Sequence, residues 1–430
     1  MFPDFHYLFR ALFGIDIPGL GILKTFGFFV AMGFLVAAYI LTRELKRKEK
    51  AGELSPIIEV QKENAPPTVS NLITRLFLGF LLGFKLIGFF IGNELSLSFG
   101  DYILSGNGHG LAGLIFAIIA YFWWKSDVKK SAQKETVETE VKVYPHQRVA
   151  DIIFIAAITG LIGAKIFNAL ETWEHFIKDP IGNLFSASGL TYYGGLIFAT
   201  IALYIYSKKK QFSFRKLCDA CAPALIIAYG VGRLGCQFAG DGDWGIYNSA
   251  YVTNEQGEVV AASGPDQFQQ IVHDNPNAFY EFRNFKEVPH KYFPSTLPTW
   301  MVAQNYKYNV NNDGIPVVNP LPGDYNHVLP VAVFPTPIYE FFMSLIIFGV
   351  LWLLRRRFKT PLQLFGVYLI FNGIERFLIE QIRVNTKYNF GFIQPTQAEL
   401  ISTGLIIAGI TLFLYVSKKS KTNPEISSQK

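Results

Sequence analysis

The sequence is short of charge and of cysteine. Asp, Glu, Lys and Arg make up 17% of its 430 residues, whereas 50% are hydrophobic. A soluble domain of this length carries more charge, so the composition argues against a soluble globular protein. The three cysteines, Cys218, Cys221 and Cys236, fall in or beside one apolar run, which excludes a disulfide framework. The first residues also lack the basic start and small-residue end of a cleavable signal peptide, so we expect the first apolar run to direct insertion.

Phenylalanine and long apolar runs are what the sequence has instead. Its 40 Phe suit a surface that faces lipid. A transmembrane helix needs roughly 20 mostly apolar residues that satisfy their own backbone hydrogen bonds. By this measure we predict an all-α polytopic membrane protein with about nine transmembrane helices and a large extracytoplasmic lobe. The predicted spans are 24–41, 72–91, 111–124, 152–170, 190–206, 217–238, 338–354, 362–382 and 398–416.

Lysine and arginine gather in short bursts at the ends of alternate spans. Bursts such as TRELKRKEK, SKKKQFSFRK, LRRRFK and SKKSKT belong to a set that follows the first, third, fifth, seventh and ninth spans. Basic residues flank membrane helices on the cytoplasmic side, so this pattern predicts the N-terminus outside and the C-terminus inside. It also argues against nucleic-acid binding, since the basic residues are accounted for as flanks.

The spans and polar stretches divide the chain into six predicted regions. The stretch SAQKETVETEVK, within the second region, is expected to be a solvated cytoplasmic linker without chemistry. The regions are an N-terminal interfacial segment with the first membrane helix (1–42), an insertion with two extra helices (43–148), core helices (149–239), the extracytoplasmic lobe (240–335), further core helices (336–417) and a cytoplasmic tail (418–430).

Ionisable residues inside spans are costly and usually face a protein interior or a water-filled cavity. Here they gather toward one leaflet: Arg233, Asp241 and Asp243 at the end of the sixth span, Glu340 at the start of the seventh, and Arg376, Glu380 and Arg383 near the end of the eighth. The spacing of four and then three in GIERFLIEQIR puts its last three charged residues on one helical face. Two arginines that converge near an interface match the oxygens of a phosphate, so a phospholipid head group is the natural ligand.

Purely structural roles for these residues are alternatives to phosphate binding. Arg376 and Glu380 could form an ion pair that only joins helices, and Gly230, Gly232 and Gly235 could only allow close helix packing. The two aspartates in GDGDWG could be turn residues.

Other motifs carry less weight. Lys165 and Glu171 in the fourth span are best explained by snorkelling or mutual pairing. Cys218 and Cys221 have CxxC spacing, but a zinc site needs two further ligands and none lies at matching spacing, so no metal is predicted. Tyr193, in TYYGGLI, could place its hydroxyl beside closely approaching backbone at Gly194 and Gly195 or be an aromatic belt residue.

Four motifs in order, TYYGGLI, GRLGCQFAGDGDWG, FPTPIYE and GIERFLIEQIR, resemble the bacterial prolipoprotein diacylglyceryl transferases. The early stretch LKTFGFFVAMGFLVAAYILTR is similar to that family's first membrane helix. The resemblance implies a multi-pass enzyme of the bacterial cytoplasmic (inner) membrane, without a cofactor. It implies transfer of the diacylglyceryl group of phosphatidylglycerol to the lipobox cysteine of a preprolipoprotein, with release of glycerol phosphate.

The resemblance also implies roles for particular residues. Arg233 and Arg376 would bind the lipid phosphate and act in catalysis, with Arg383, Gly194 and Gly195 helping to bind substrate. Glu340, Glu380 and either Asp241 or Asp243 would be supporting acidic residues; the aspartate is ambiguous because this segment is one residue longer than the family's pattern. A carboxylate or Tyr193 would relay the proton of the substrate thiol.

The chain departs from the family's pattern at three positions. Tyr193 stands where the family has His, Cys236 stands where it has Asn, and Phe26 stands where it has Tyr. The alternatives from other classes are a secondary transporter of an anionic solute and a non-catalytic membrane scaffold. A transporter often shows internal repeats and broken helices, and neither is evident in the sequence.

Overall fold

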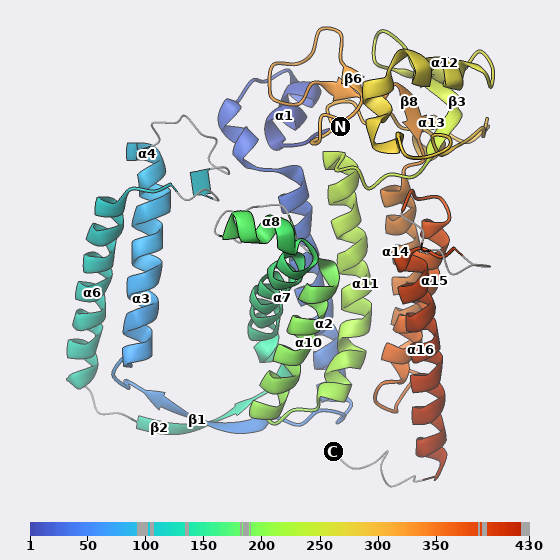
Figure 1. Ribbon diagram of the computed structural model, residues 1–430. Helices are drawn as coiled ribbons and strands as arrows, with labels where there is room; N and C mark the ends of the chain where they lie inside the picture. The colour runs from blue at the N-terminus through green and yellow to red at the C-terminus, as the bar shows by residue number, and fades with distance from the viewer. Residues whose placement is uncertain are drawn as a thin grey trace. The chain divides into compact units, whose positions relative to one another are not determined.

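The computed structural model describes residues 1–92, 102–103, 107–133, 137–180, 183, 189, 191–385, 388 and 394–422. The chain forms two compact units, one made of Met1–Glu44 with Arg215–Lys430 and the other of Leu45–Phe214 (Figure 1). The division into six regions remains a prediction. The end of its cytoplasmic tail (423–430) and the first residue of the fifth predicted span, Leu190, lie outside the described residues.

Most of the predicted spans are confirmed as helices of spanning length. Among the described residues, seven helical segments are long and apolar enough to cross a bilayer: Thr25–Lys50, Val69–Gly92, Gly110–Ala132, Pro145–Glu171, Phe214–Ala239, Thr336–Leu354 and Gln397–Ser420. The other two predicted spans also form helices, α10 (Tyr192–Lys209) and α15 (Gln363–Glu380), each of 18 residues. These two helices are less apolar than the other seven, because α10 contains four tyrosines and ends in two lysines, while α15 carries three charged residues. The protein is therefore a mostly helical, multi-span membrane protein.

The first unit contains helices that pack through small residues. A Cβ at Gly366 of α15 would lie 3.1 Å from the Gly409 carbonyl oxygen of α16, and one at Gly230 of α11 would lie 2.7 Å from Ser344 Cβ of α14. Such close approach is how membrane helices gain packing energy without a hydrophobic driving force. The helices outside the lobe are α1 (Phe5–Phe13), η1 (Pro18–Ile22), α2 (Thr25–Lys50, whose end belongs to the second unit), α11 (Phe214–Ala239), α14 (Thr336–Leu354), α15 and α16 (Gln397–Thr422).

A buried aspartate fixes the start of α15 against α11. The carboxylate of Asp219 on α11 accepts hydrogen bonds from the backbone N–H of Leu362 at 2.7 Å and of Phe365 at 2.8 Å. An anion at a helix N-terminus satisfies otherwise unpaired N–H groups and is favoured by the helix dipole. This contact fixes the position of α15 along its axis relative to α11, and with it the position of the charged residues near its other end.

Residues 240–335 form a folded lobe that contains β-structure, which the all-α prediction did not include. Strand β3 pairs with β4, β5 and β8, and β6 pairs with β7. Its core is aromatic and β-branched, with Tyr247, Phe268, Tyr306, Val331 and Val333 all buried. These residue types fit a pleated, half-buried surface. The elements are β3 (Tyr247–Thr253), β4 (Val259–Ala261), α12 (Gln267–Asp274), η4 (Pro276–Phe282), β5 (His290–Lys291), α13 (Thr299–Val302), β6 (Ile315–Pro316), β7 (His327–Val328) and β8 (Val331–Val333).

The second unit contains the two extra helices and a two-stranded ladder. Strands β1 and β2 are antiparallel, with Ile57 opposite Val143 and Glu63 opposite Val137. The end of the stretch predicted as a solvated linker is thus strand β2, whose residues are mostly exposed. The elements are β1 (Ile57–Glu63), α3 (Val69–Leu81), the π-helix η2 (Leu82–Ile87), α4 (Gly88–Gly92), α6 (Gly110–Ala132), β2 (Val137–Val143), η3 (Pro145–Arg148), α7 (Val149–Glu171), α8 (Trp173–Lys178) and α10.

Polar contacts within this unit join the end of α2, strand β1, the start of α7 and the end of α10. The carboxylate of Glu49, near the end of α2, binds both Nδ1 of His146 at 2.6 Å and the backbone N–H of His146 at 2.9 Å. Glu59 of β1 accepts from Arg148 at 2.5 Å and from Lys210 at 3.1 Å. Four segments distant in sequence are therefore held together at one place.

Candidate functional site

Arg233 lies near the end of α11, where the helix meets the lobe, and its guanidinium is buried. Nε donates to Glu340 Oε2 at 2.5 Å and Nη2 contacts the same oxygen. Nη1 pairs with Asp243 and lies 3.2 Å from Cys236 Sγ. Glu340, in the first turns of α14, is fully buried. Because a buried charge needs partners, Arg233 ties α11 to both α14 and the start of the lobe.

Arg376 on α15 reaches the same carboxylate from the other side. Its Nη1 lies 3.7 Å from Glu340 Oε1 and its Nη2 lies 3.2 Å from Glu380 Oε2, one helical turn further along α15. Its side chain is 29% exposed, compared with 10% for that of Arg233. The two arginines that the sequence singled out thus meet at one carboxylate, and Arg376 is the more accessible of them.

A third arginine joins the group through the turn after α11. Arg383 Nη2 lies 2.5 Å from Asp243 Oδ1, while the other oxygen of Asp243 faces Arg233. Burial by itself would raise the pKa of Asp243, but the two arginines outweigh it and lower that pKa well below its ordinary value. We call these six residues, which bring alternating charges from three helices and from the turns that follow α11 and α15, the arginine cluster: Arg233, Asp243, Glu340, Arg376, Glu380 and Arg383.

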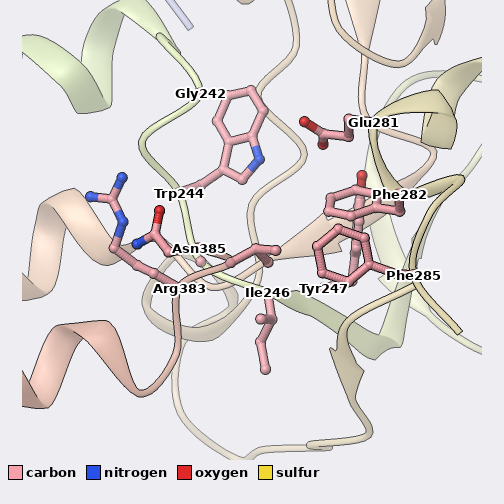
Figure 2. A pocket seen from close by; sticks show the side chains of 11 residues that line it. Gly242, Trp244, Ile246, Tyr247, Glu281, Phe282, Phe285, Arg383 and Asn385 are labelled. Carbon is pink, nitrogen blue, oxygen red and sulfur yellow. The ribbon is translucent and has the colours of Figure 1, made fainter. Parts of the chain in front are cut away.

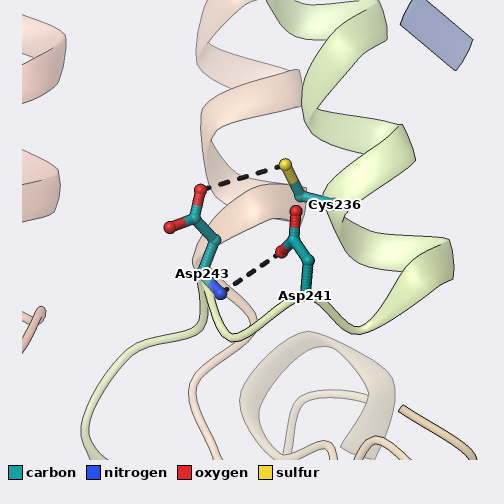
Figure 3. A group of neighbouring side chains, drawn as sticks. All are labelled: Cys236, Asp241 and Asp243. Atoms are coloured by element: carbon teal, nitrogen blue, oxygen red, sulfur yellow. Dashed lines mark hydrogen bonds between the residues drawn. The ribbon is translucent and has the colours of Figure 1, made fainter. Parts of the chain in front are cut away.

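The turn GDGDWG distinguishes its two aspartates. Gly240 and Gly242 have positive φ, +66° and +91°, which bends the chain so that Asp243 points between two arginines. Asp241 instead accepts the backbone N–H of Asp243 at 3.3 Å, as Figure 3 shows. Burial and the neighbouring Asp243 raise the pKa of Asp241. Asp241 is therefore the more basic carboxylate of the pair.

Cys236, Asp241 and Asp243 bring their ligand atoms within 4.8 Å of one another, a spacing that suits a metal ion (Figure 3). Arg233 occupies that place, since it pairs with Asp243 and contacts Cys236 Sγ. A bound cation would have to displace a guanidinium, so the donor set does not fit a metal. The three cysteines of the chain are free.

Sequence reasoning missed two residues of this region, Tyr229 and Glu375. The hydroxyl of Tyr229, on α11, is 2.8 Å from Glu340 Oε1 and 3.4 Å from Glu375 Oε1. Tyr229 lies one helical turn before Arg233, and that spacing could have found it. Glu375 adjoins Arg376 in the sequence, but nothing in the pattern indicates that it turns into the bundle.

The glycines around Arg233 support the packing interpretation at two of three positions. A Cβ at Gly230 would meet Ser344 of α14, and one at Gly235 would lie 3.1 Å from Phe29 Cβ of α2. No atom of the described residues lies within 4 Å of a Cβ at Gly232. Packing and an arginine site therefore coexist on α11.

Tyr193, Gly194 and Gly195 belong to the second unit, at the start of α10. A Cβ at Gly194 would lie 2.4 Å from the Gly163 carbonyl oxygen of α7, and one at Gly195 would lie 2.9 Å from that of Gly160. These glycines therefore let α7 and α10 touch along their backbones. The roles of the three residues in substrate binding and proton transfer remain predictions.

Lys165 and Glu171 of α7 each contact a residue outside that helix. Lys165 Nζ donates to the Asn183 carbonyl oxygen at 3.1 Å, and Glu171 accepts from the Thr191 hydroxyl at 2.7 Å. These contacts suit a structural role at the end of α7.

A hollow of about 250 Å³ adjoins the arginine cluster on the lobe side. Figure 2 shows Arg383 and Asn385 on one side of it and Glu281 on the other, with Trp244, Tyr247, Phe282 and Phe285 as aromatic walls. Gly242 and Trp244, the neighbours of Asp243, also line it. The cluster is thus reached from a partly polar cavity and not from a sealed core.

Comparison with known proteins agrees with this architecture. A family model described as prolipoprotein diacylglyceryl transferase matches residues 107–415, well over half of the chain. A phosphatidylglycerol–prolipoprotein diacylglyceryl transferase of Dehalococcoides mccartyi is 27% identical over 188 residues, which cover 42% of this chain and 66% of that protein, just under two thirds of its length. The enzyme of another strain is 22% identical over 331 residues, 76% of this chain and 95% of the relative. That of Bacillus cytotoxicus is 27% identical over 287 residues, 66% of this chain and 82% of the relative.

The fold and the site define a multi-span membrane protein with buried, carboxylate-bound arginines at the ends of its helices. Within that class, the chain belongs to the prolipoprotein diacylglyceryl transferase family. Members of this family transfer the diacylglyceryl group of phosphatidylglycerol to a prolipoprotein cysteine.

Proposed function

We propose that this chain carries out the family's transfer at the arginine cluster. The observation that carries the proposal is that Arg233 and Arg376, from separate helices, share the carboxylate of Glu340. Guanidinium groups bind phosphate oxygens through paired hydrogen bonds and stay charged at any working pH. A phosphatidylglycerol head group therefore has two converging cations to bind, with Arg383 as a third beside the hollow.

Arg376 is the arginine that first meets the lipid in this proposal. Its side chain is the most exposed of the three, and its contact with Glu340, at 3.7 Å, is long for an ion pair. A phosphate oxygen can replace that contact at little cost, because Glu340 keeps its shorter bond to Arg233. Arg233 then stabilises the negative charge that develops as the phosphate leaves.

The reaction needs a proton acceptor for the substrate thiol, whose unperturbed pKa is about 8.5. The lipobox sulfur attacks the glycerol carbon that bears the phosphate, an S–C bond forms, and the C–O bond to the phosphate breaks with its electron pair on the departing glycerol phosphate. We assign the thiol proton to Asp241, whose raised pKa makes it a better base than Asp243. Tyr193 stays the alternative acceptor predicted from the family's histidine position.

The basic bursts support a topology for this reaction. They predict the N-terminus outside, the C-terminus inside and the lobe outside a bacterial cytoplasmic membrane. Preprolipoproteins are exported through that membrane, so a lipobox peptide would reach the lobe end of α11, α14 and α15.

The experiment incubates purified protein with phosphatidylglycerol vesicles and a lipobox peptide, and measures the mass increase of one diacylglyceryl group. We expect Arg233→Ala to reduce transfer by about 10²–10³-fold, the typical loss when one charge-stabilising donor is removed. Arg283→Ala is the matched control, because Arg283 is an exposed lobe arginine stacked on Tyr280.

The same assay tests the alternatives. A transporter or a scaffold would show no modified peptide with the unaltered chain. Full transfer by Arg233→Ala would contradict the assignment of the site while leaving the activity intact.

A further inference from the structure

Glu375 is a buried acidic residue to which the proposed transfer gives no role. It lies on α15 directly before Arg376 and is 2% exposed. Its Oε1 lies 3.4 Å from the Tyr229 hydroxyl, and its Oε2 is buried without a hydrogen-bond partner among the described residues. A carboxylate held this way would carry an uncompensated buried charge, which is among the most costly arrangements in a protein.

The Tyr229 hydroxyl has too few hydrogen atoms to donate to both neighbouring carboxyl groups. A tyrosine hydroxyl has one hydrogen to donate, and an ionised carboxylate only accepts. The 2.8 Å contact from Tyr229 to Glu340 takes that hydrogen. The contact to Glu375 is then a hydrogen bond only if Glu375 supplies the hydrogen and the tyrosine oxygen accepts it.

The ion pairs point to the same protonation state. Glu340, Glu380 and Asp243 pair with the three arginines of the cluster, whereas no ion pair of Glu375 occurs in the part of the chain that the structure describes. The charges of the arginine cluster therefore balance without Glu375. An ionised Glu375 beside Glu340 would add an excess negative charge next to the proposed phosphate site.

We propose that Glu375 is a protonated carboxylic acid and a positioning residue. It donates its proton to Tyr229, which in turn donates to Glu340 and holds that carboxylate against Arg233 and Arg376. The site thus gains a hydrogen-bond support but no charge, and the arginines keep their affinity for a lipid phosphate. Its effect on lipid binding rests on the proposed function, whereas the protonation state does not.

The groups that face Glu375 set the conditions of the test. Tyr229 and Arg233 face it from α11, Glu340 from α14, and Arg376 from its own helix. On the side of α16, Gly373 packs on Ser402 and Ile406, and the one acidic residue of that helix, Glu399, is bonded to Gln381 and to the Thr396 backbone. Glu340 is the one acidic residue among these facing groups.

Infrared spectroscopy of the full chain in lipid nanodiscs reads the protonation state directly. A protonated carboxyl has a C=O stretch distinct from the bands of a carboxylate, and the stretch shifts in D₂O. We expect Glu375→Gln to remove such a band at neutral pH and Glu380→Gln, which removes an arginine-paired carboxylate, to leave it. A band unchanged by Glu375→Gln would overturn the proposal, whether or not the protein transfers lipid.

Kinetics test the positioning role. Glu375→Gln keeps a neutral hydrogen-bond donor, so we expect kcat and KM for phosphatidylglycerol to stay near those of the unaltered chain at neutral pH. At alkaline pH the unaltered chain loses lipid affinity as Glu375 ionises, and Glu375→Gln does not. Glu375→Ala leaves Tyr229 without its donor, and we expect KM to rise about tenfold, which corresponds to the loss of one hydrogen bond near charged groups. Equal losses in Glu375→Gln and Glu375→Ala at neutral pH would overturn the role.

Discussion

Arg233 binds Glu340 through two nitrogens, Nε at 2.5 Å and Nη2, in a pair that joins α11 to α14 with almost no exposure to solvent. The desolvation penalty of burying two charges can exceed the free energy gained from their attraction, so such a pair is weak evidence for stability. Removing one partner is nevertheless strongly destabilising, because it leaves the other charge buried and unpaired. In the proposed function this bond stays in place, while Arg376 exchanges its 3.7 Å contact with Glu340 for the lipid phosphate.

Removal of Glu340 alone is expected to destabilise the protein. Among the described residues, Glu340→Ala would leave Arg233 with Asp243 as its one carboxylate partner, and losing one partner of a buried pair costs about 3–5 kcal/mol. The measurement is the midpoint of thermal unfolding in detergent. The double variant Arg233→Met with Glu340→Met is expected to recover most of the loss, and a double variant as unstable as Glu340→Ala would contradict the explanation.

The ion pairs of Asp243 are expected to survive acid. The two arginines lower its pKa below the ordinary value of 3.8, so its contribution to stability is present above that value and is lost only as the pH falls through the lower folded-state pKa. Asp243→Asn should therefore lower the unfolding midpoint by similar amounts at pH 7 and pH 5. A difference that disappears at pH 5 would mean that the arginines do not hold this carboxylate.

We expect the ionisation of Asp241 to determine the acid limb of the pH–rate profile, where the transfer rate falls at low pH. Burial and Asp243 raise its pKa, and a base must be ionised to accept a proton, so the transfer rate falls as the pH drops through that raised pKa. Asp241→Asn should lower kcat by about 10²–10⁴-fold and abolish the limb. The pH profile of peptide modification checks this, with the exposed Asp266→Asn as control. An unchanged profile would return the role to Tyr193.

We expect Gly194 to be required for the packing of α10 against α7, whether or not it also helps to bind substrate. Its Cβ would lie 2.4 Å from the Gly163 carbonyl oxygen, whereas a Cβ at Gly160 in the same helix pair would meet its nearest neighbour at 3.7 Å. Gly194→Ala should lower the unfolding midpoint and Gly160→Ala should not. Should Gly194→Ala fold normally and yet bind phosphatidylglycerol weakly, the substrate-binding prediction would be favoured over packing.

Periodicity and hydropathy were enough to predict most of the membrane helices. Long runs of apolar residues identify such helices without tertiary information, and the spacing of Arg376 and Glu380 indicated their shared face. The prediction that Arg383 continues this helical face is wrong, because α15 ends at Glu380 and Arg383 lies in the turn that follows. The convergence of Arg233, Glu340 and Arg376 followed from depth alone, because each lies near the end of a span. Tyr229 and Glu375 were missed because a single aromatic or acidic residue inside a span does not show which neighbour it faces.

The β-structure could not be predicted because its evidence is distributed along the chain. Strand β2 reads VETEVKV and pairs with IIEVQKE across two intervening membrane helices, so no local signal joins them. The two aspartates of GDGDWG are equivalent in the sequence and become distinct only through the positive φ of Gly242, which directs Asp243 to the arginines. Both cases depend on contacts between residues far apart or on a backbone angle that composition does not reveal.

The contact between Glu49 and His146 joins the two ends of the predicted insertion. The chain leaves α2 and, after the ladder and the two extra helices, comes back to the same carboxylate before α7 begins. The two ends of the predicted insertion therefore lie together, so this segment can be removed or replaced without pulling the flanking helices apart. The same geometry offers a site at which a foreign domain could be grafted onto this membrane protein with both of its ends already in register.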